Sequence, residues 1–92
     1  MNTKYLQDHY DELVLRSDTF FSMVDTLEEK ETKEVALGKA AAHAQDAELF
    51  FLFCHVNLNV KLTKVLTDWD KAQVTEMLNR EPLKFDAHVQ NA

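Results

Sequence analysis

Residues 39–81, KAAAHAQDAELFFLFCHVNLNVKLTKVLTDWDKAQVTEMLNRE, form a stretch that contains neither glycine nor proline. Counted from Leu37, this stretch follows a four-three rhythm in which every member except Glu48 and His55 is apolar. The positions are Ala41, Ala44, Glu48, Phe51, His55, Leu58, Leu62, Val65, Trp69 and Ala72. A heptad pattern of this length predicts a long helix that packs along its length against other helices.

The N-terminal third has the same spacing, at Leu6, Tyr10, Leu13, Ser17, Phe20, Val24 and Leu27. It predicts an amphipathic helix over about residues 3–28, capped by Asn2 or Thr3. Acidic side chains should lie mainly on its outer face and continue beyond its end. This predicted acidic face consists of Asp8, Asp11, Glu12, Asp18, Asp25, Glu28 and Glu29.

The second helix is predicted over about residues 33–66, with an uncertainty of several residues at its start. Thr67 and Asp70 resemble a capping box, so a third helix is predicted over about residues 68–80. Pro82 should stop that helix, and residues 81–92 are predicted to be an irregular tail. The fold class is therefore all-α, with two long helices, one short C-terminal helix and a single domain.

One segment supports a competing interpretation. Residues 56–63, VNLNVKLT, alternate between apolar and polar side chains as a half-buried strand does. A strand that continued back to Leu49 would be about three times the usual length, and the segment contains no hairpin turn. Any partner strand would also have to come from the strongly helical N-terminal third or the short tail, so helix is favoured over strand.

A helix over residues 35–66 would be about 48 Å long at 1.5 Å per residue. A compact globule of this chain length has a radius of gyration of about 12 Å, so the helix would extend beyond it. We therefore expect homodimerisation to complete a helical bundle. An antiparallel crossing near Phe51 and Leu52 would place Glu48 of each copy opposite His55 of the other. The predicted dimer interface is Glu48, Phe51, Leu52, His55, Leu58 and Leu62.

Composition and charge limit the classes of function. The chain has 92 residues, of which 46% are hydrophobic, with one cysteine and a net charge of −6. The lone Cys54 favours a cytoplasmic location, and no secretion signal or membrane span is expected. Residues 1–34 hold nine acids and four bases, a net charge of −5. This balance argues against direct binding of nucleic acid and leaves open a basic partner.

The residue types that carry chemistry do not form a known motif. No Gly-rich phosphate loop, HExxH or GxSxG occurs, so no enzyme activity and no cofactor are expected. Cys54 stands among apolar residues and is interpreted as buried and inert. Potential metal ligands occur only in small groups, which are His9 with Asp8 and Glu12, His43 with Asp46, and Asp86 with His88. We interpret them as polar residues on ordinary solvated helix faces.

These features predict a small acidic non-enzymatic interaction protein that binds and regulates or inhibits a larger protein. Its acidic face would imitate phosphates at a basic nucleic-acid-binding site on that partner. Phage and plasmid accessory inhibitors offer an analogy for such a protein. The alternative is a helical bundle that binds a metal or a small ligand, and a dimer that binds nucleic acid is a third hypothesis.

Overall fold

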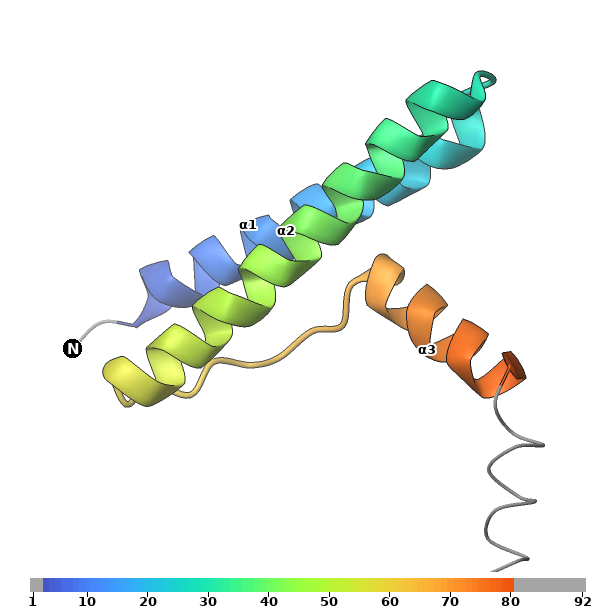
Figure 1. Cartoon of the computed structure of the whole chain (residues 1–92). Helices are drawn as coiled ribbons and strands as arrows, with labels where there is room; N and C mark the ends of the chain where they lie inside the picture. Colours follow the sequence, from blue (N-terminus) through green and yellow to red (C-terminus); the bar gives the residue numbers. More distant parts are fainter. Residues whose placement is uncertain (1–2, 81–92) are drawn as a thin grey trace, which may run out of the picture.

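The computed structural model describes residues 3–80, which form three α-helices and one 3-10 turn (Figure 1). Helix α1 spans Lys4–Met23, the 3-10 turn η1 spans Val24–Thr26, α2 spans Lys30–Asn57 and α3 spans Asp68–Arg80. No strand occurs within residues 3–80, so the predicted all-α class is confirmed. The predicted tail, 81–92, lies outside the described residues.

Helices α1 and α2 form an antiparallel hairpin (Figure 1). α1 ends at Met23 and not at the predicted residue 28, because η1 tightens the last turn and Leu27 is extended, at φ −87° and ψ 144°. Glu29 is also extended and precedes α2, which starts three residues before the predicted residue 33. The chain therefore reverses direction within the acidic segment where the apolar stripe stops.

The hairpin is packed through small residues on α2. Ala36, Ala40, Ala44 and Ala47 are buried. The Ser17 hydroxyl on α1 donates a buried hydrogen bond of 2.7 Å to the carbonyl oxygen of Ala40. Helix axes approach closely only where the side chains between them are small, so this alanine stripe sets the spacing of the two helices.

Larger side chains fill the core at the other end of the hairpin, near the start of α1 and the end of α2. The core cluster comprises Leu6, Tyr10, Leu13, Val14, Ala47, Cys54 and Leu62, with Phe50, Phe51 and Val60 packed against it. Burial of these apolar groups, at about 25 cal/mol per Å² removed from water, is the main force that stabilises the hairpin.

The prediction of a helix over residues 33–66 is wrong at its C-terminal end, since α2 stops at Asn57. Asn59 has a left-handed φ of 55°, a conformation that asparagine tolerates and that commonly ends helices. The N–H of Val60 donates a hydrogen bond of 2.9 Å to the carbonyl oxygen of Cys54, which satisfies one of the carbonyl groups at the helix end. The heptad run from Ala41 to Ala72 is therefore not one continuous helix.

Residues 58–67, which we call the strap, form neither a helix nor a strand and run back along α1 (Figure 1). The Gln7 side chain accepts a hydrogen bond of 2.8 Å from the Thr63 N–H and donates one of 3.1 Å to the Thr63 carbonyl. The Tyr10 hydroxyl makes the same pair of bonds with Val65, both of 3.1 Å. These side chains replace the neighbouring strand that the alternating pattern predicts, and the alternation places Leu62 in the core.

Helix α3 begins at Asp68, where the sequence places the third helix. Thr67 is buried, and its hydroxyl accepts a hydrogen bond of 3.0 Å from the Asp70 N–H. The Asp18 carboxylate on α1 accepts one of 2.8 Å from the Asp68 N–H. Both contacts satisfy N–H groups that a helix N-terminus leaves free, and the second anchors α3 to α1.

Beyond this anchored start, α3 diverges from the hairpin (Figure 1). The radius of gyration is 16.8 Å, against about 12 Å for a compact chain of this length. None of the helices within residues 3–80 is both long enough and apolar enough to cross a bilayer. The fold is thus a two-helix hairpin with a strap and a projecting third helix.

Replacing Tyr10 by phenylalanine should release the centre of the strap. Loss of the hydroxyl leaves the Val65 N–H and carbonyl without their partner, and we expect unfolding free energy to fall by about 1–3 kcal/mol. In hydrogen exchange followed by NMR, the Val65 amide should lose protection while the Thr63 amide, bonded to Gln7, keeps it. Tyr5→Phe is the control, because Tyr5 is exposed. An unchanged Val65 amide would contradict this account of the strap.

Ala40 and Ala42 provide a matched test of the hairpin packing. Ala40 has no exposed surface and lies at the contact with Ser17, whereas Ala42 is exposed two residues later. Ala40→Leu should lower the unfolding free energy by about 1–3 kcal/mol because the larger side chain forces the helices apart. Ala42→Leu should change it by less than about 0.5 kcal/mol. Urea denaturation measures both, and equal effects would refute close packing at Ala40.

Candidate functional site

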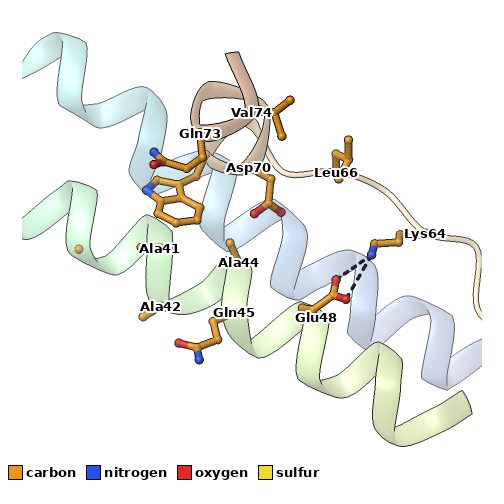
Figure 2. Close-up of a pocket in the computed structure, with 12 residues that line it drawn as sticks. Ala41, Ala42, Ala44, Gln45, Glu48, Lys64, Leu66, Asp70, Gln73 and Val74 are labelled. Carbon is orange, nitrogen blue, oxygen red and sulfur yellow. Dashed lines mark hydrogen bonds and ion pairs between the residues drawn. The ribbon is translucent and has the colours of Figure 1, made fainter. Parts of the chain in front are cut away.

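The divergence of α3 from α2 leaves an open groove between the two helices (Figure 2). Its volume is about 690 Å³, which lies within the range of roughly 300–1,000 Å³ for ligand-binding clefts. The strap closes one side of it. The lining residues are Gly38, Ala41, Ala42, Ala44, Gln45, Glu48, Lys64, Leu66, Trp69, Asp70, Gln73 and Val74.

Small residues of α2 form the floor of the groove. Gly38, Ala41 and Ala42 lie there, and a Cβ atom built on Gly38 would meet nothing within 4 Å. Gly38 is therefore not required by any close contact among the described residues, although glycine within a helix costs about 1 kcal/mol relative to alanine. The floor has room for another element to approach the α2 backbone.

Polar groups occupy the opposite wall and the strap end of the groove. Asp70 of α3 is half-buried, and Figure 2 shows its carboxylate directed towards Ala44 on α2. Within residues 3–80, no hydrogen bond reaches this carboxylate, whose electrostatic interaction is with the Lys64 ammonium. Trp69, the only tryptophan of the chain, also lines the groove and is half-buried.

An ion pair closes the strap end, where the Lys64 ammonium lies 2.9 Å from the Glu48 carboxylate. The ammonium also lies 5.5 Å from the centre of the Phe51 ring. The hydrogen bond to Glu48 is the main cause of a raised pKa at Lys64. A raised lysine pKa stabilises the fold below pH 10.5, and this stabilisation is lost as pH rises through the folded-state value. Both side chains are nearly half exposed, so the pair contributes little.

The side of α2 that faces away from α1 carries a second four-three pattern, which we call the outer face. Its members are all exposed and are Gly38, Ala42, Gln45, Leu49, Leu52 and Val56. The N-terminal half of the outer face forms the groove floor. In the C-terminal half, Leu49, Leu52 and Val56, with the neighbouring Phe53, are 44–73% exposed. We call these four residues the apolar stripe.

The sequence prediction missed the outer face, although its spacing was present in the chain. The heptad counted from Leu37 runs beside it and includes residues that the structure buries or pairs internally. A helix with apolar residues on nearly every side gives more than one heptad register. The choice between these registers depends on where α1 and the strap lie.

The six residues of the predicted dimer interface do not share one surface. Leu52, His55 and Leu58 are exposed. Leu62, by contrast, is buried in the core, and Phe51 is half-buried with its ring 5.8 Å from that of Tyr10. Their burial comes from α1 and the strap of the same chain.

Glu48, the sixth residue of that interface, is engaged within the chain by Lys64. The predicted contact between Glu48 and His55 of a second copy would have to compete with this ion pair for the Glu48 carboxylate.

The predicted acidic face is divided among different surroundings. Asp8 pairs with Lys4 and Glu12 with Arg16, both at 2.8 Å, on the exposed side of α1. Asp11 accepts a hydrogen bond of 2.9 Å from Gln7, and Asp18 caps α3. Asp11 and Asp18 also line a second, smaller hollow of about 330 Å³ beside the strap.

The other three acids, Asp25, Glu28 and Glu29, are exposed at the turn between α1 and α2. No hydrogen bond or ion pair within residues 3–80 engages their carboxylates. The acidic residues that are available to a partner therefore lie at the hairpin turn more than along α1.

The residues considered as metal ligands lie apart. Within the described part of the chain, no group of three or more histidine, cysteine, aspartate and glutamate side chains is arranged to hold a metal ion. His9 packs edge-on against Phe50, with 4.8 Å between the ring centroids, and His43 stacks on Phe20, with 5.5 Å between the ring centroids. The buried Nδ1 atom of His43 has no hydrogen-bond partner among residues 3–80. Asp86 and His88 lie outside the described residues.

Cys54 is fully buried in the core cluster. Burial raises the pKa of its thiol, because the charged thiolate would lose its hydration there. A thiol that is kept protonated and out of contact with water is a poor nucleophile, which suits a packing role.

Comparison of the chain with protein-family models, curated proteins and solved structures finds no match.

Proposed function

We propose that this chain is a small non-enzymatic interaction protein that binds a larger protein and regulates or inhibits it. The observation that carries the proposal is the outer face of α2, which is exposed along its whole length and borders an open groove. A soluble helix normally turns its large apolar residues inwards. Here α2 buries alanines against α1 and exposes the four larger residues of the apolar stripe.

Exposed apolar area supports an interaction role. Side chains of this size expose on the order of 100 Å² each when about half accessible, so the apolar stripe presents roughly 400 Å². Val74, Met77 and Leu78 of α3 are also 49–66% exposed. A patch of this extent lies within the range of about 300–600 Å² for the largest apolar patch of a typical monomer, and such patches are often functional.

The charge of −6 favours a basic partner. Asp25, Glu28 and Glu29 at the hairpin turn present exposed carboxylates without partners among the described residues. Such a group can imitate phosphates and occupy a basic nucleic-acid-binding site on the partner. The form of regulation that we propose is inhibition by competition with nucleic acid. The carboxylates would pair with the lysine and arginine side chains that otherwise bind phosphates.

We further propose that two copies associate through the apolar stripe. An antiparallel crossing of α2 helices about a twofold axis places Leu49 opposite Val56 of the second copy, and Leu52 opposite Phe53 of the second copy. This register shifts the predicted one towards the residues that are exposed, and it leaves the ion pair of Glu48 intact. In this register the two α2 helices, each ending at Asn57, overlap over residues 48–57, about three turns of each helix. The small buried area implies a weak dimer that forms as concentration rises.

Substitution within the apolar stripe tests the dimer. Leu52→Asp should raise the dissociation constant of the dimer at least tenfold, because two charges would be buried at the twofold axis. Leu15→Asp is the control, since Leu15 is exposed on α1, outside the apolar stripe. Sedimentation velocity from 1 to 500 µM measures both variants. A monomer at all concentrations of the native chain would refute the proposed association.

Capture experiments test binding to a larger protein. The native chain, Leu15→Asp, Leu52→Asp and Ala42→Leu would be immobilised and exposed to lysate, with bound proteins identified by mass spectrometry. We expect a basic protein that is retained by the native chain and by Leu15→Asp but is depleted at least fivefold by Ala42→Leu. Added DNA or RNA should reduce its capture. Capture that no groove or stripe substitution alters would contradict the proposed surface.

A further inference from the structure

The groove between α2 and α3 has the shape of a helix-binding site. From Gly38 to Glu48 its floor runs about 15 Å along α2, which corresponds to roughly three turns of a second helix. The small side chains of the floor permit close approach of another backbone, as the alanine stripe does on the opposite side of α2. Leu66, Trp69 and Val74 supply apolar walls.

The fold holds this groove open. α3 is anchored at its first turn by Asp18 and Thr67, and the strap that precedes it is bound at Thr63 and Val65. These contacts fix the first turn of α3 and the path of the strap relative to α1. The groove is therefore a feature of the folded chain that a partner fills without first having to create it.

The charged residues of the groove indicate which side chains a partner segment should carry. Lys64, the only cationic residue of the lining, pairs with Glu48 and interacts only electrostatically with the half-buried Asp70, whose carboxylate accepts no hydrogen bond among residues 3–80. The whole chain carries a charge of −6. A partner segment with lysine or arginine at this place would gain a charge-assisted hydrogen bond to Asp70.

We propose that the groove binds an amphipathic helix of the partner, with small and apolar side chains against Gly38 and Ala42 and a lysine or arginine at Asp70. This mode is recognition of a helix in a groove, in which apolar anchors give affinity and flanking charge gives selectivity. The inference rests on the proposed function and specifies the segment by which the partner is recognised. The apolar stripe remains available to the second copy.

Three synthetic 18-residue peptides without tryptophan test this inference. The first has leucine and alanine on one helical face and lysine on the other, the second has glutamate in place of each lysine, and the third is a scrambled form of the first. Trp69 reports binding through its fluorescence, because it is the only tryptophan and lines the groove. The full-length chain would be titrated at 0.15 M salt.

The lysine peptide should bind at least fivefold more tightly than both other peptides. Asp70→Asn should weaken binding of the lysine peptide about fivefold and should not weaken binding of the glutamate peptide, because the repulsion between like charges is removed. Ala42→Leu should weaken binding of the lysine peptide at least tenfold by filling the floor. Lys39→Leu is the matched control, since Lys39 is exposed on α2 but does not line the groove. Circular dichroism would verify that each variant keeps its helices.

Each unexpected result of the peptide titrations would contradict a different part of the inference. Equal binding of the lysine and glutamate peptides, lost in Ala42→Leu, would overturn the basic preference and keep the groove as a binding site. Equal binding of the scrambled peptide would overturn helix recognition. Binding by none of the peptides would overturn the inference and remove the groove from the proposed function. Loss of self-association in Ala42→Leu would assign the groove to a second copy and overturn the inference.

Discussion

The hydrogen bonds between the Tyr10 hydroxyl and the backbone of Val65 hold the centre of the strap against α1. Because an extended segment without a neighbouring strand leaves its N–H and carbonyl groups unpaired, its position depends on such side-chain partners. Gln7 makes the equivalent pair of bonds at Thr63. Together they place Lys64 beside Glu48 and bring Thr67 and Asp68 to the point where α3 starts. The groove exists because this short segment is fixed.

The two faces of helix α2 carry apolar side chains of different size. The face towards α1 carries alanines and permits the close contact at Ser17, while the outer face carries the larger residues of the apolar stripe. Close packing therefore stabilises the hairpin without covering the apolar stripe. A chain that leaves such area in water has lower solubility unless something covers it, and this is the physical link between the fold and the proposed interactions.

Local patterns in the sequence predicted some elements well. The capping pattern of Thr67 and Asp70 placed the start of the third helix at Asp68, because N-terminal capping depends on residues within one turn. The end of α2 was predicted nine residues too far along the chain. There the heptad continued through Leu58, Leu62 and Val65, and helical and alternating periods competed within the same residues. The partners that decided between them, Gln7 and Tyr10, lie more than 50 residues away in the chain.

The sequence by itself determined the all-α class, the amphipathic character of α1, the site where α3 begins and the acidic charge, because each depends on composition or on contacts within a few residues. Only the tertiary structure decided which register of α2 faces α1, and therefore which residues remain exposed. It also decided that Glu48 pairs with Lys64 and that Leu62 is buried. These outcomes depend on the path of the strap, which is set by hydrogen bonds between distant parts of the chain that no local period encodes.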